Sequence, residues 1–242
     1  MTGSRLKDFI FVPSVQHTGT WFTINFLKNF IPISYELTNT TLFPEAAILH
    51  VHLPIKNYMD FNSYSFNTEF EKKWLSNLTT KRSLPVPILL LFCDMFKTVI
   101  PVRDPLAAIL TREARYPQFR HFFIVDGFVA LATEFAKHPN VVFLPIDLYT
   151  NEMDRKNALI KVVNHCDIKI NESIIDAVAK EWPIENNTPN NRFKQLYNDG
   201  NIDEIRRLLG SKWAEVEYLK NMAAKILPFM DKLGYAGYSK LW

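Results

Sequence analysis

The fold is decided by the stretch Ser14-Val-Gln-His-Thr-Gly-Thr-Trp-Phe-Thr-Ile-Asn-Phe-Leu27, which follows the apolar run Phe9-Ile-Phe-Val12. The apolar run is typical of a buried strand, and the second half of the quoted stretch has the residues of a helix. Gly19 lies between them and permits a tight turn. The sequence therefore predicts a strand, a glycine turn and a helix that begins at Thr20.

This predicted turn is suited to bind an anion. The first backbone N–H groups of a helix have no partner within the helix, and with the helix dipole they attract phosphate or sulfate oxygens. Gly19 lets the backbone come close to such a ligand, and Thr18 and Thr20 offer hydroxyl donors. His17 offers a further donor or a positive charge, but no lysine precedes the hydroxyl residue as it does in ATP-binding P-loops. An ordinary turn with an N-cap threonine is the alternative interpretation.

A second turn of this kind occurs within Lys97-Thr-Val-Ile-Pro-Val-Arg-Asp-Pro-Leu-Ala-Ala-Ile-Leu-Thr111. Arg103 follows a predicted buried strand, and Pro105 suits the first turn of the next helix. Thr111 lies eight residues after Arg103, about two helical turns on, so a guanidinium and a hydroxyl are able to grip one phosphate together. In the alternative interpretation, Asp104 caps the helix and Arg103 forms a structural ion pair.

Strands and helices alternate along the whole chain. The predicted strands are Phe9–Pro13, Ala47–Val51, Thr98–Val102 and Val141–Pro145. The predicted helices are Thr20–Phe30, Glu69–Leu78, Ile88–Phe96, Leu106–Arg115, Phe123–Lys137, Arg155–His165, Ile174–Glu181, Ile202–Leu209 and Lys212–Lys232. Such alternation predicts an α/β fold with three αβα layers, in which a mostly parallel central sheet has helices on both faces. Ligands bind at the carboxyl ends of the strands of such sheets, where both anion-suited turns are expected.

The composition predicts one globular domain, residues 1–242, because apolar residues make up 48% of the chain and charged residues 22%. A formal net charge of +3 is too small to indicate nucleic-acid binding. Cys93 and Cys166 lack metal-site spacing and are predicted to be reduced thiols in the core. The longest apolar run, Val86–Cys93, is too short to span a bilayer. The expected location is cytoplasmic, and neither nucleic acid nor a membrane is an expected partner.

A third polar segment, His50-Val-His-Leu-Pro54, follows a short predicted strand. His50 and His52 point to the same side of an extended chain, a spacing that suits two metal ligands. The neighbouring sequence offers no convincing third ligand, so we expect no metal site. A histidine just past a strand end is also well placed to act as a general base.

Together these segments resemble the motifs of the sulfotransferases that use 3′-phosphoadenosine 5′-phosphosulfate (PAPS). That family carries a 5′-phosphosulfate loop like Lys-Ser-Gly-Thr-Thr-Trp after its first strand, where this chain has His17-Thr-Gly-Thr-Trp-Phe22. It also carries a strand that ends in Arg-Asn/Asp-Pro with a serine eight residues after the arginine, matched here by Arg103-Asp-Pro105 and Thr111. Its cytosolic branch has a Thr-His-Leu-Pro segment, matched by Val51-His-Leu-Pro54. The three matches follow the family's order.

The resemblance implies a P-loop NTPase-like scaffold and a metal-independent transfer of the sulfuryl group from PAPS to a hydroxyl or amine of a small-molecule or glycan acceptor. It implies that His52 deprotonates the acceptor and that His17 stabilises charge on the leaving phosphate. It also implies which residues contact PAPS and the product adenosine 3′,5′-bisphosphate: Gln16, His17, Thr18, Gly19, Thr20, Trp21, Phe22, Arg103, Thr111, Arg206 and Arg207. The oligomeric state cannot be read from the sequence.

The chain differs from the family pattern at the catalytic positions. His17 stands where the family has a lysine or arginine, and Phe22 stands where it often has an adenine-contacting tryptophan. The spacing from His52 to the second turn is longer than in the cytosolic branch. Glu45 and Asp60 are therefore alternative candidates for the base.

The chain also differs from the pattern near its C-terminus. Arg206 and Arg207 match only part of the family's Arg-Lys-Gly segment at the 3′-phosphate, and Arg192 and Lys194 are rival candidates. Two other functions remain open at this stage. One is a non-catalytic adenosine-bisphosphate-binding protein on the same scaffold, and the other is a P-loop nucleotide kinase or phosphotransferase.

Overall fold

The structure, a computed structural model, describes residues 9–31, 34–36, 48–52, 86–118, 121–182, 191–237, 239 and 241. Its centre is a five-stranded sheet in the order β2-β3-β1-β4-β5, and every pair of neighbouring strands is parallel. The strands are β1 (Ile10–Ser14), β2 (Ser34–Glu36), β3 (Ile48–His52), β4 (Lys97–Val102) and β5 (Val141–Pro145). The predicted parallel sheet is confirmed.

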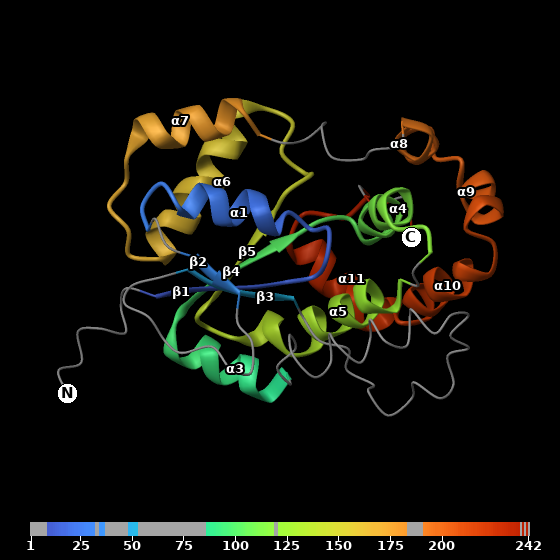
Figure 1. The fold of residues 1–242 in the computed structure, drawn as a ribbon, viewed down its shortest axis with the longest axis horizontal. Helices are drawn as coiled ribbons and strands as arrows, with labels where there is room; N and C mark the ends of the chain where they lie inside the picture. The colour runs from blue at the N-terminus through green and yellow to red at the C-terminus, as the bar shows by residue number, and fades with distance from the viewer. Residues whose placement is uncertain are drawn as a thin grey trace.

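Helices cover both faces of the sheet (Figure 1). The helices are α1 (Thr20–Leu27), α3 (Val86–Met95), α4 (Pro105–Arg115), α5 (Phe122–Thr133), α6 (Glu152–His165), α7 (Glu172–Lys180), α8 (Asn191–Asn198), α9 (Ile202–Leu209), α10 (Trp213–Asn221) and α11 (Ala223–Lys232), with short 3₁₀ turns η3 (Phe135–Lys137) and η4 (Gly210–Lys212). Figure 1 shows α1, α6 and α7 on one side of the sheet and α3, α5 and α11 on the other. This arrangement is the three-layer αβα architecture predicted from the alternation of elements.

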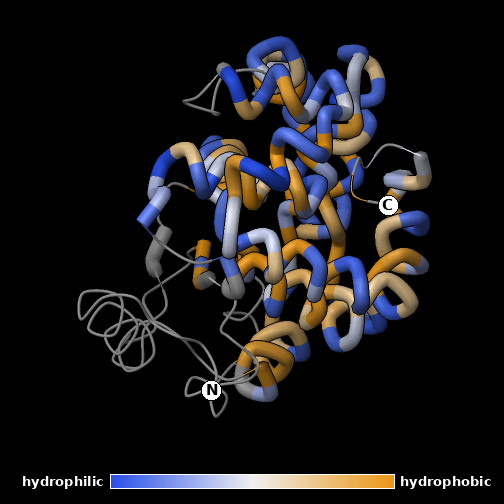
Figure 2. The backbone as a smooth tube through the Cα atoms, turned by 90° about the vertical axis from the view of Figure 1, so that its right-hand side faces the viewer, coloured by the Kyte–Doolittle hydropathy of each residue, from blue (hydrophilic) through white to orange (hydrophobic). Residues whose placement is uncertain are grey.

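The residues of β1 bury both of its faces. Ile10 and Val12 belong to the apolar core that contains residues of α1, α6 and α7, whereas Phe11 belongs to the core that contains residues of α3 and α5. A strand between two helical layers needs apolar residues on both sides, which explains the continuous apolar run in the sequence. Figure 2 shows hydrophobic and hydrophilic positions alternating along the helices, as expected when each helix buries one side.

Two elements of the structure, β2 and α8, were not predicted from the sequence. β2 has only three residues at the sheet edge, which is too short for a recognisable strand pattern. α8 (Asn191–Asn198) has no counterpart among the predicted helices. The predicted helix Glu69–Leu78 lies outside the described residues.

The predicted helix Lys212–Lys232 is wrong in one respect, because the chain forms η4, α10 and α11 there, with a break at Met222. The buried residues Leu219 and Ile226 lie on opposite sides of the break and seven residues apart. Seven residues correspond to about two helical turns, so the apolar spacing continues across the break and hides it from the sequence pattern.

Both cysteines lie in the core as free thiols, as predicted. Burial raises the pKa of Cys93 to about 11 and that of Cys166 to about 12, so neither thiol is a reactive thiolate at neutral pH. In the part of the chain that the structure describes, none of the helices has the length and apolar character needed to cross a membrane.

Candidate functional site

The two anion-suited turns lie beside each other at the carboxyl edge of the sheet. β1 and β4 are neighbouring strands, and they are followed by residues 15–19 and by Arg103 and Asp104, respectively. After β1 the chain passes through α1 to β2 at one edge of the sheet, whereas after β4 it passes through α4 and α5 to β5 at the other edge. Neighbouring parallel strands whose connections diverge in this way leave a crevice at their ends, which is where ligands bind in open α/β sheets.

The first turn has an unusual backbone. Gly19 is the N-cap of α1 and has a φ angle of 98°, which glycine adopts readily. A Cβ atom at this position would lie 2.7 Å from Cγ1 of Ile146, so the turn packs directly against the residue that follows β5. His17 has a φ angle of 64°, which is uncommon for a residue with a side chain. Such conformations persist where the surrounding fold holds them, and they concentrate at ligand-binding sites.

The two threonine hydroxyls stabilise the first turn itself. Thr18 Oγ1 donates to the Val15 carbonyl and Thr20 Oγ1 donates to Ser14 Oγ, each at 2.7 Å. The first N–H groups of α1 have no partner within the helix, and Gly19 supplies no side-chain cap. An anion at this turn would therefore be bound chiefly by backbone N–H groups, while the hydroxyls hold the backbone in place.

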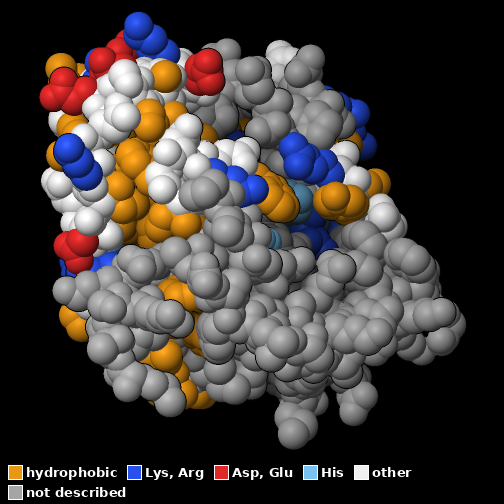
Figure 3. All heavy atoms as spheres, turned by 60° about the vertical axis from the view of Figure 1, so that its left-hand side comes forward, with side chains coloured by type: hydrophobic (Ala, Val, Ile, Leu, Met, Phe, Trp, Pro, Cys, Tyr) orange, Lys and Arg blue, Asp and Glu red, His pale blue; other side chains and the backbone are white. Residues whose placement is uncertain are grey.

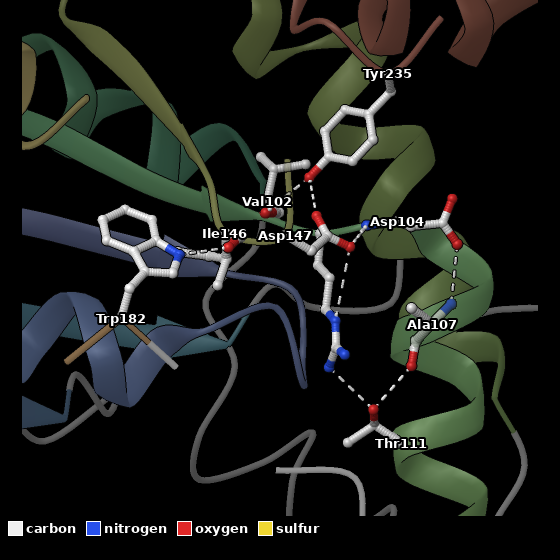
Figure 4. Close-up of polar contacts among 9 residues, drawn as sticks. Val102, Asp104, Ala107, Thr111, Ile146, Asp147, Trp182 and Tyr235 are labelled. Carbon is white, nitrogen blue, oxygen red and sulfur yellow. Dashed lines mark hydrogen bonds and ion pairs between the residues drawn. The ribbon is translucent and has the colours of Figure 1, made fainter. Parts of the chain in front are cut away.

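In the second turn, Arg103 contacts Thr111 and Asp147, which are labelled in Figure 4. Arg103 Nη1 donates to Thr111 Oγ1 at 3.0 Å, and this hydroxyl donates to the Ala107 carbonyl at 2.8 Å. Arg103 Nε lies 3.8 Å from Asp147 Oδ2, and the Arg103 side chain is 21% exposed. A guanidinium has five N–H donors, so these two contacts leave donors for a phosphate. The ion pair of the alternative interpretation is present, and the binding of a phosphate by Arg103 and Thr111 stays a prediction.

Asp147 connects the second turn to the C-terminal part of the chain. Its Oδ2 accepts from the Asp104 N–H at 3.0 Å, and its Oδ1 accepts from the Tyr235 hydroxyl at 2.6 Å. Burial raises the pKa of Asp147, while the Tyr235 hydrogen bond and the positive charge of Arg103 oppose that rise. Asp104 caps α4 as expected, because its Oδ1 accepts from the Ala107 N–H at 3.0 Å. Burial raises the pKa of Asp104 to about 6.

Gln16 connects the first turn to α4. Nη1 of Arg112 donates a hydrogen bond to Gln16 Oε1. Arg112 directly follows Thr111, which contacts Arg103 in the second turn. Consecutive residues of α4 therefore contact the two turns and help to fix their relative positions.

Histidine and aromatic side chains lie around the first turn. Trp21 is 63% exposed, and its ring centroid lies 5.6 Å from that of His50. The His17 ring centroid lies 6.0 Å from that of Tyr116, which is also exposed. Figure 3 shows a hollow on one face of the molecule where histidine, lysine or arginine, and hydrophobic side chains gather. Planar and cationic side chains at a surface hollow suit a ligand that has both rings and negative charge.

Phe22, next to Trp21 in α1, contacts a different aromatic side chain. Its ring packs edge-on against Trp182, with the centroids 4.7 Å apart. Trp182 Nε1 donates to the Ile146 carbonyl at 2.7 Å, which holds the indole against the end of β5. The position expected to contact adenine is thus part of an aromatic pair that borders the turn.

The C-terminal arginines have other contacts. Arg207 donates to Glu204 through Nε and Nη2 at 2.6 and 2.7 Å, and Arg192 Nη2 donates to the same carboxylate at 2.7 Å. The Arg206 guanidinium lies 5.8 Å from the centroid of the Trp213 ring. Figure 1 shows α9 at the edge of the molecule, with α4 between it and the sheet. The assignment of Arg206 and Arg207 to the 3′-phosphate stays a prediction.

His52 is the last residue of β3, and its backbone is in register with Ser14 at the end of β1. The structure describes the backbone of His52 but not its side chain, and Glu45 and Asp60 lie outside the described residues. The choice of base therefore stays a prediction. Within the described ranges, no group of three His, Cys, Asp or Glu side chains is arranged to hold a metal ion.

Sequence reasoning missed several residues that build the site. The position of Asp147 was a signal in the sequence, because this residue lies two positions after the predicted strand Val141–Pro145, near a strand end as Arg103 is. Tyr235, Arg112 and Trp182 had no such signal, since their contacts join segments far apart in the chain. Tertiary packing alone brings these three side chains to the two turns.

No protein-family model matches the sequence, and no curated protein matches it. Among solved structures, the chain is similar to a crystal structure of mouse sulfotransferase SULT7A1 complexed with PAP, with 16% sequence identity and a TM-score of 0.41. The similarity covers 76% of this chain and 69% of that chain. A similarity of this size does not identify a substrate.

Replacing Gly19 by alanine tests the packing of the first turn. Gly19→Ala combines an unfavourable positive φ with a Cβ that collides with Ile146, so we expect it to destabilise the protein by about 2–4 kcal/mol. Gly200→Ala is the matched control, because Gly200 has a φ of 67° with nothing within 4 Å of the added Cβ. Urea unfolding should show a clearly larger loss for Gly19→Ala, and equal losses would contradict the close contact with Ile146.

Replacing Asp104 by asparagine tests its raised pKa. Because burial raises this pKa from 3.8 to about 6, the folded state binds the proton more tightly than the unfolded chain, and stability decreases as the pH rises through that window. Asp104→Asn keeps an oxygen for the Ala107 N–H but cannot ionise. We expect the variant to lose less stability than the wild type between pH 4 and 7, by on the order of 1–3 kcal/mol in urea unfolding. Identical pH dependences would argue against a buried, ionising Asp104.

Proposed function

We propose that the protein is a sulfotransferase that takes PAPS as its donor and a hydroxyl or amine of a small-molecule or glycan as its acceptor. The observation that carries the proposal is the pairing of two anion-suited turns at the ends of β1 and β4. One turn presents the start of a helix, and the other presents Arg103 beside Thr111. PAPS fits this pairing because it carries a phosphosulfate at one end and a 3′-phosphate at the other.

The donor would lie across the strand ends. Backbone N–H groups from Gly19 onward would bind the 5′-phosphosulfate at the start of α1, where charge and orphan donors favour an anion. Arg103 would bind the 3′-phosphate, and the Thr111 hydroxyl would join it by turning its proton from the Ala107 carbonyl to the phosphate. The edge-packed pair of Phe22 and Trp182 would offer an apolar surface to the adenine ring.

The proposed transfer moves one sulfuryl group in line. The acceptor oxygen or nitrogen forms a bond to sulfur while the bond between sulfur and the 5′-phosphate oxygen breaks, which releases adenosine 3′,5′-bisphosphate. His52 would take the proton of the acceptor, and its backbone register with Ser14 supports this role because it sets the residue beside the first turn. His17 would stabilise the charge that develops on the leaving phosphate. By analogy with phosphoryl transfer, positioning and charge stabilisation supply most of the catalysis.

One observation favours a second candidate function, which is binding of adenosine bisphosphate without turnover. The first turn, residues 15–19, contains neither lysine nor arginine, and His17 occupies the position of the family's basic residue. An imidazole provides less positive charge at neutral pH than a lysine or arginine. A protein with this turn would still hold the nucleotide through its backbone and through Arg103.

Calorimetric titration with adenosine 3′,5′-bisphosphate, AMP and Mg-ATP tests the proposal. We expect the bisphosphate to bind at least about 10-fold more tightly than AMP, since a charge-assisted contact contributes roughly 1.5–3 kcal/mol. Absence of binding, or a preference for Mg-ATP, would contradict the proposal, and the latter would indicate a phosphotransferase. Sulfate transfer from labelled PAPS to a set of hydroxyl and amine acceptors then separates an enzyme from a non-catalytic binding protein.

A substitution of Arg103 tests the assignment of the 3′-phosphate. Arg103→Ala should weaken binding of adenosine 3′,5′-bisphosphate about 10–100-fold and binding of AMP by no more than about 2-fold, because only the former places a phosphate at this residue. Lys161→Ala, on the exposed side of α6, removes one positive charge elsewhere and serves as the control. Equal losses for both nucleotides would overturn the assignment of Arg103 to the 3′-phosphate.

A further inference from the structure

Helix α4 carries two consecutive side chains that reach the two turns. Thr111 accepts a hydrogen bond from Arg103 at 3.0 Å, and Arg112 donates one to the side chain of Gln16. Neighbouring residues of a helix point about 100° apart, so one helical turn is able to face both strand ends. The Thr111 contact fits the proposed 3′-phosphate site, whereas the contact of Arg112 with Gln16 has no counterpart in the motifs found in the sequence.

Arg112 is held rigidly in the interior. Its side chain is only 2% exposed, and burial lowers its pKa to about 10, so it remains protonated at neutral pH. Glu215, on α10, contributes a compensating negative charge. Glu215 also accepts from the backbone N–H of His121 at the start of α5. A buried guanidinium with a charged partner keeps a defined position, because moving it would expose an uncompensated charge.

A second set of contacts supports this position of Arg112. Glu113 Oε2, on the same helix, accepts from His121 Nε2 at 3.0 Å and from Lys212 Nζ at 2.6 Å. Burial lowers the pKa of His121, which favours the neutral imidazole. The positive charges of Arg112 and Lys212 thus balance the negative charges of Glu113 and Glu215. The cluster is therefore a rigid support and not a source of net positive charge for the first turn.

The contact with Arg112 determines which way the Gln16 amide faces. A guanidinium only donates hydrogen bonds, so the amide must present its oxygen to Arg112. The amide nitrogen of Gln16, with its two N–H donors, then lies on the side of the amide that faces away from Arg112. Gln16 belongs to the turn in which Gly19 and the start of α1 form the proposed anion site. An oriented N–H donor in such a turn is suited to an anionic oxygen.

We propose that Arg112 is a positioning residue that fixes the Gln16 side chain so that its amide nitrogen donates to the 5′-phosphate group of the nucleotide. This inference rests on the proposed function, because it assigns a further contact to the same donor site. In this proposal the side chain of Gln16 binds the ligand directly. Helix α4 then contributes at both ends of the nucleotide, through Thr111 at the 3′-phosphate and through Arg112 beside Gln16.

Titration of Gln16→Met with adenosine 3′,5′-bisphosphate and with adenosine 3′-phosphate tests the Gln16 contact. Methionine has a similar length and no amide, so we expect about 10-fold weaker binding of the bisphosphate. Adenosine 3′-phosphate lacks the 5′-phosphate, and its affinity should change by no more than about 2-fold. Gln195→Met, at an exposed position of α8, should leave both affinities unchanged and is the control for the substitution itself.

The role of Arg112 is tested with Arg112→Lys and the double variant. Lysine keeps the charge but loses the planar guanidinium fork. Arg112→Lys should therefore weaken binding of the bisphosphate about 3–10-fold and change the affinity for adenosine 3′-phosphate by no more than about 2-fold. Because Arg112 acts through Gln16, the double variant Gln16→Met/Arg112→Lys should bind no more weakly than Gln16→Met alone, within about 2-fold. If the double variant loses affinity for the bisphosphate by the product of the two single-variant factors, the positioning role of Arg112 would be overturned.

A measurement on the wild type keeps the inference falsifiable if Arg112→Lys does not fold. The side-chain amide resonances of Gln16, identified by their absence from Gln16→Met, should shift when adenosine 3′,5′-bisphosphate is added and not when adenosine 3′-phosphate is added. Equal shifts, or an unchanged bisphosphate affinity in Gln16→Met, would overturn the inference. Failure of the wild type to bind the bisphosphate would instead overturn the proposed function.

Discussion

The central constraint of this structure is the position of β1 between β3 and β4 in a fully parallel sheet. The carboxyl ends of parallel strands all lie at the same edge of the sheet. The residues that follow β1, β3, β4 and β5 are therefore brought together by the direction of the strands alone. The buried residues of β1 cannot shift by one position without exchanging their two faces. The strand register thus places the glycine turn, Arg103, Asp147 and His52 at one edge of the sheet.

The charged groups at this edge are paired before any ligand binds. Arg103 faces Asp147, and the negative charge of Glu215 compensates the positive charge of the Arg112 guanidinium. Such pairs remove the cost of an isolated buried charge, and they hold the donors in fixed directions. A phosphate that binds Arg103 meets a guanidinium already oriented by Thr111 and Asp147, which reduces the entropy lost on binding. An anion that bound Arg103 would have to compete with Asp147 for the guanidinium.

The sequence allowed four of the five strands, most helices and both turns to be predicted, because each depends on residues that are close in the chain. A buried run followed by Gly19, or by Arg103 and Pro105, marks a strand end with a turn wherever it occurs. The division at Met222 was not predictable from apolar spacing, because the spacing continues across it. The contacts of Arg112 and Tyr235 were not predictable either, since they join α4 and the C-terminal segment to residues that are more than 80 positions away.

The arginines that contact the two turns come from one segment of the chain, and the first turn itself contains none. In the sulfotransferase pattern that the sequence resembles, a basic residue belongs to the first turn, whereas here residues 15–19 include only His17, held at a left-handed φ beside Tyr116. The arginines that contact the two turns, Arg103 and Arg112, both come from the segment of β4 and α4. Asp104 caps the start of α4, and the helix is buried from Pro105 to Arg112, which holds this segment in place. Any net positive charge for an anion at the two turns would therefore come from Arg103, since the charge of Arg112 is balanced by Glu215.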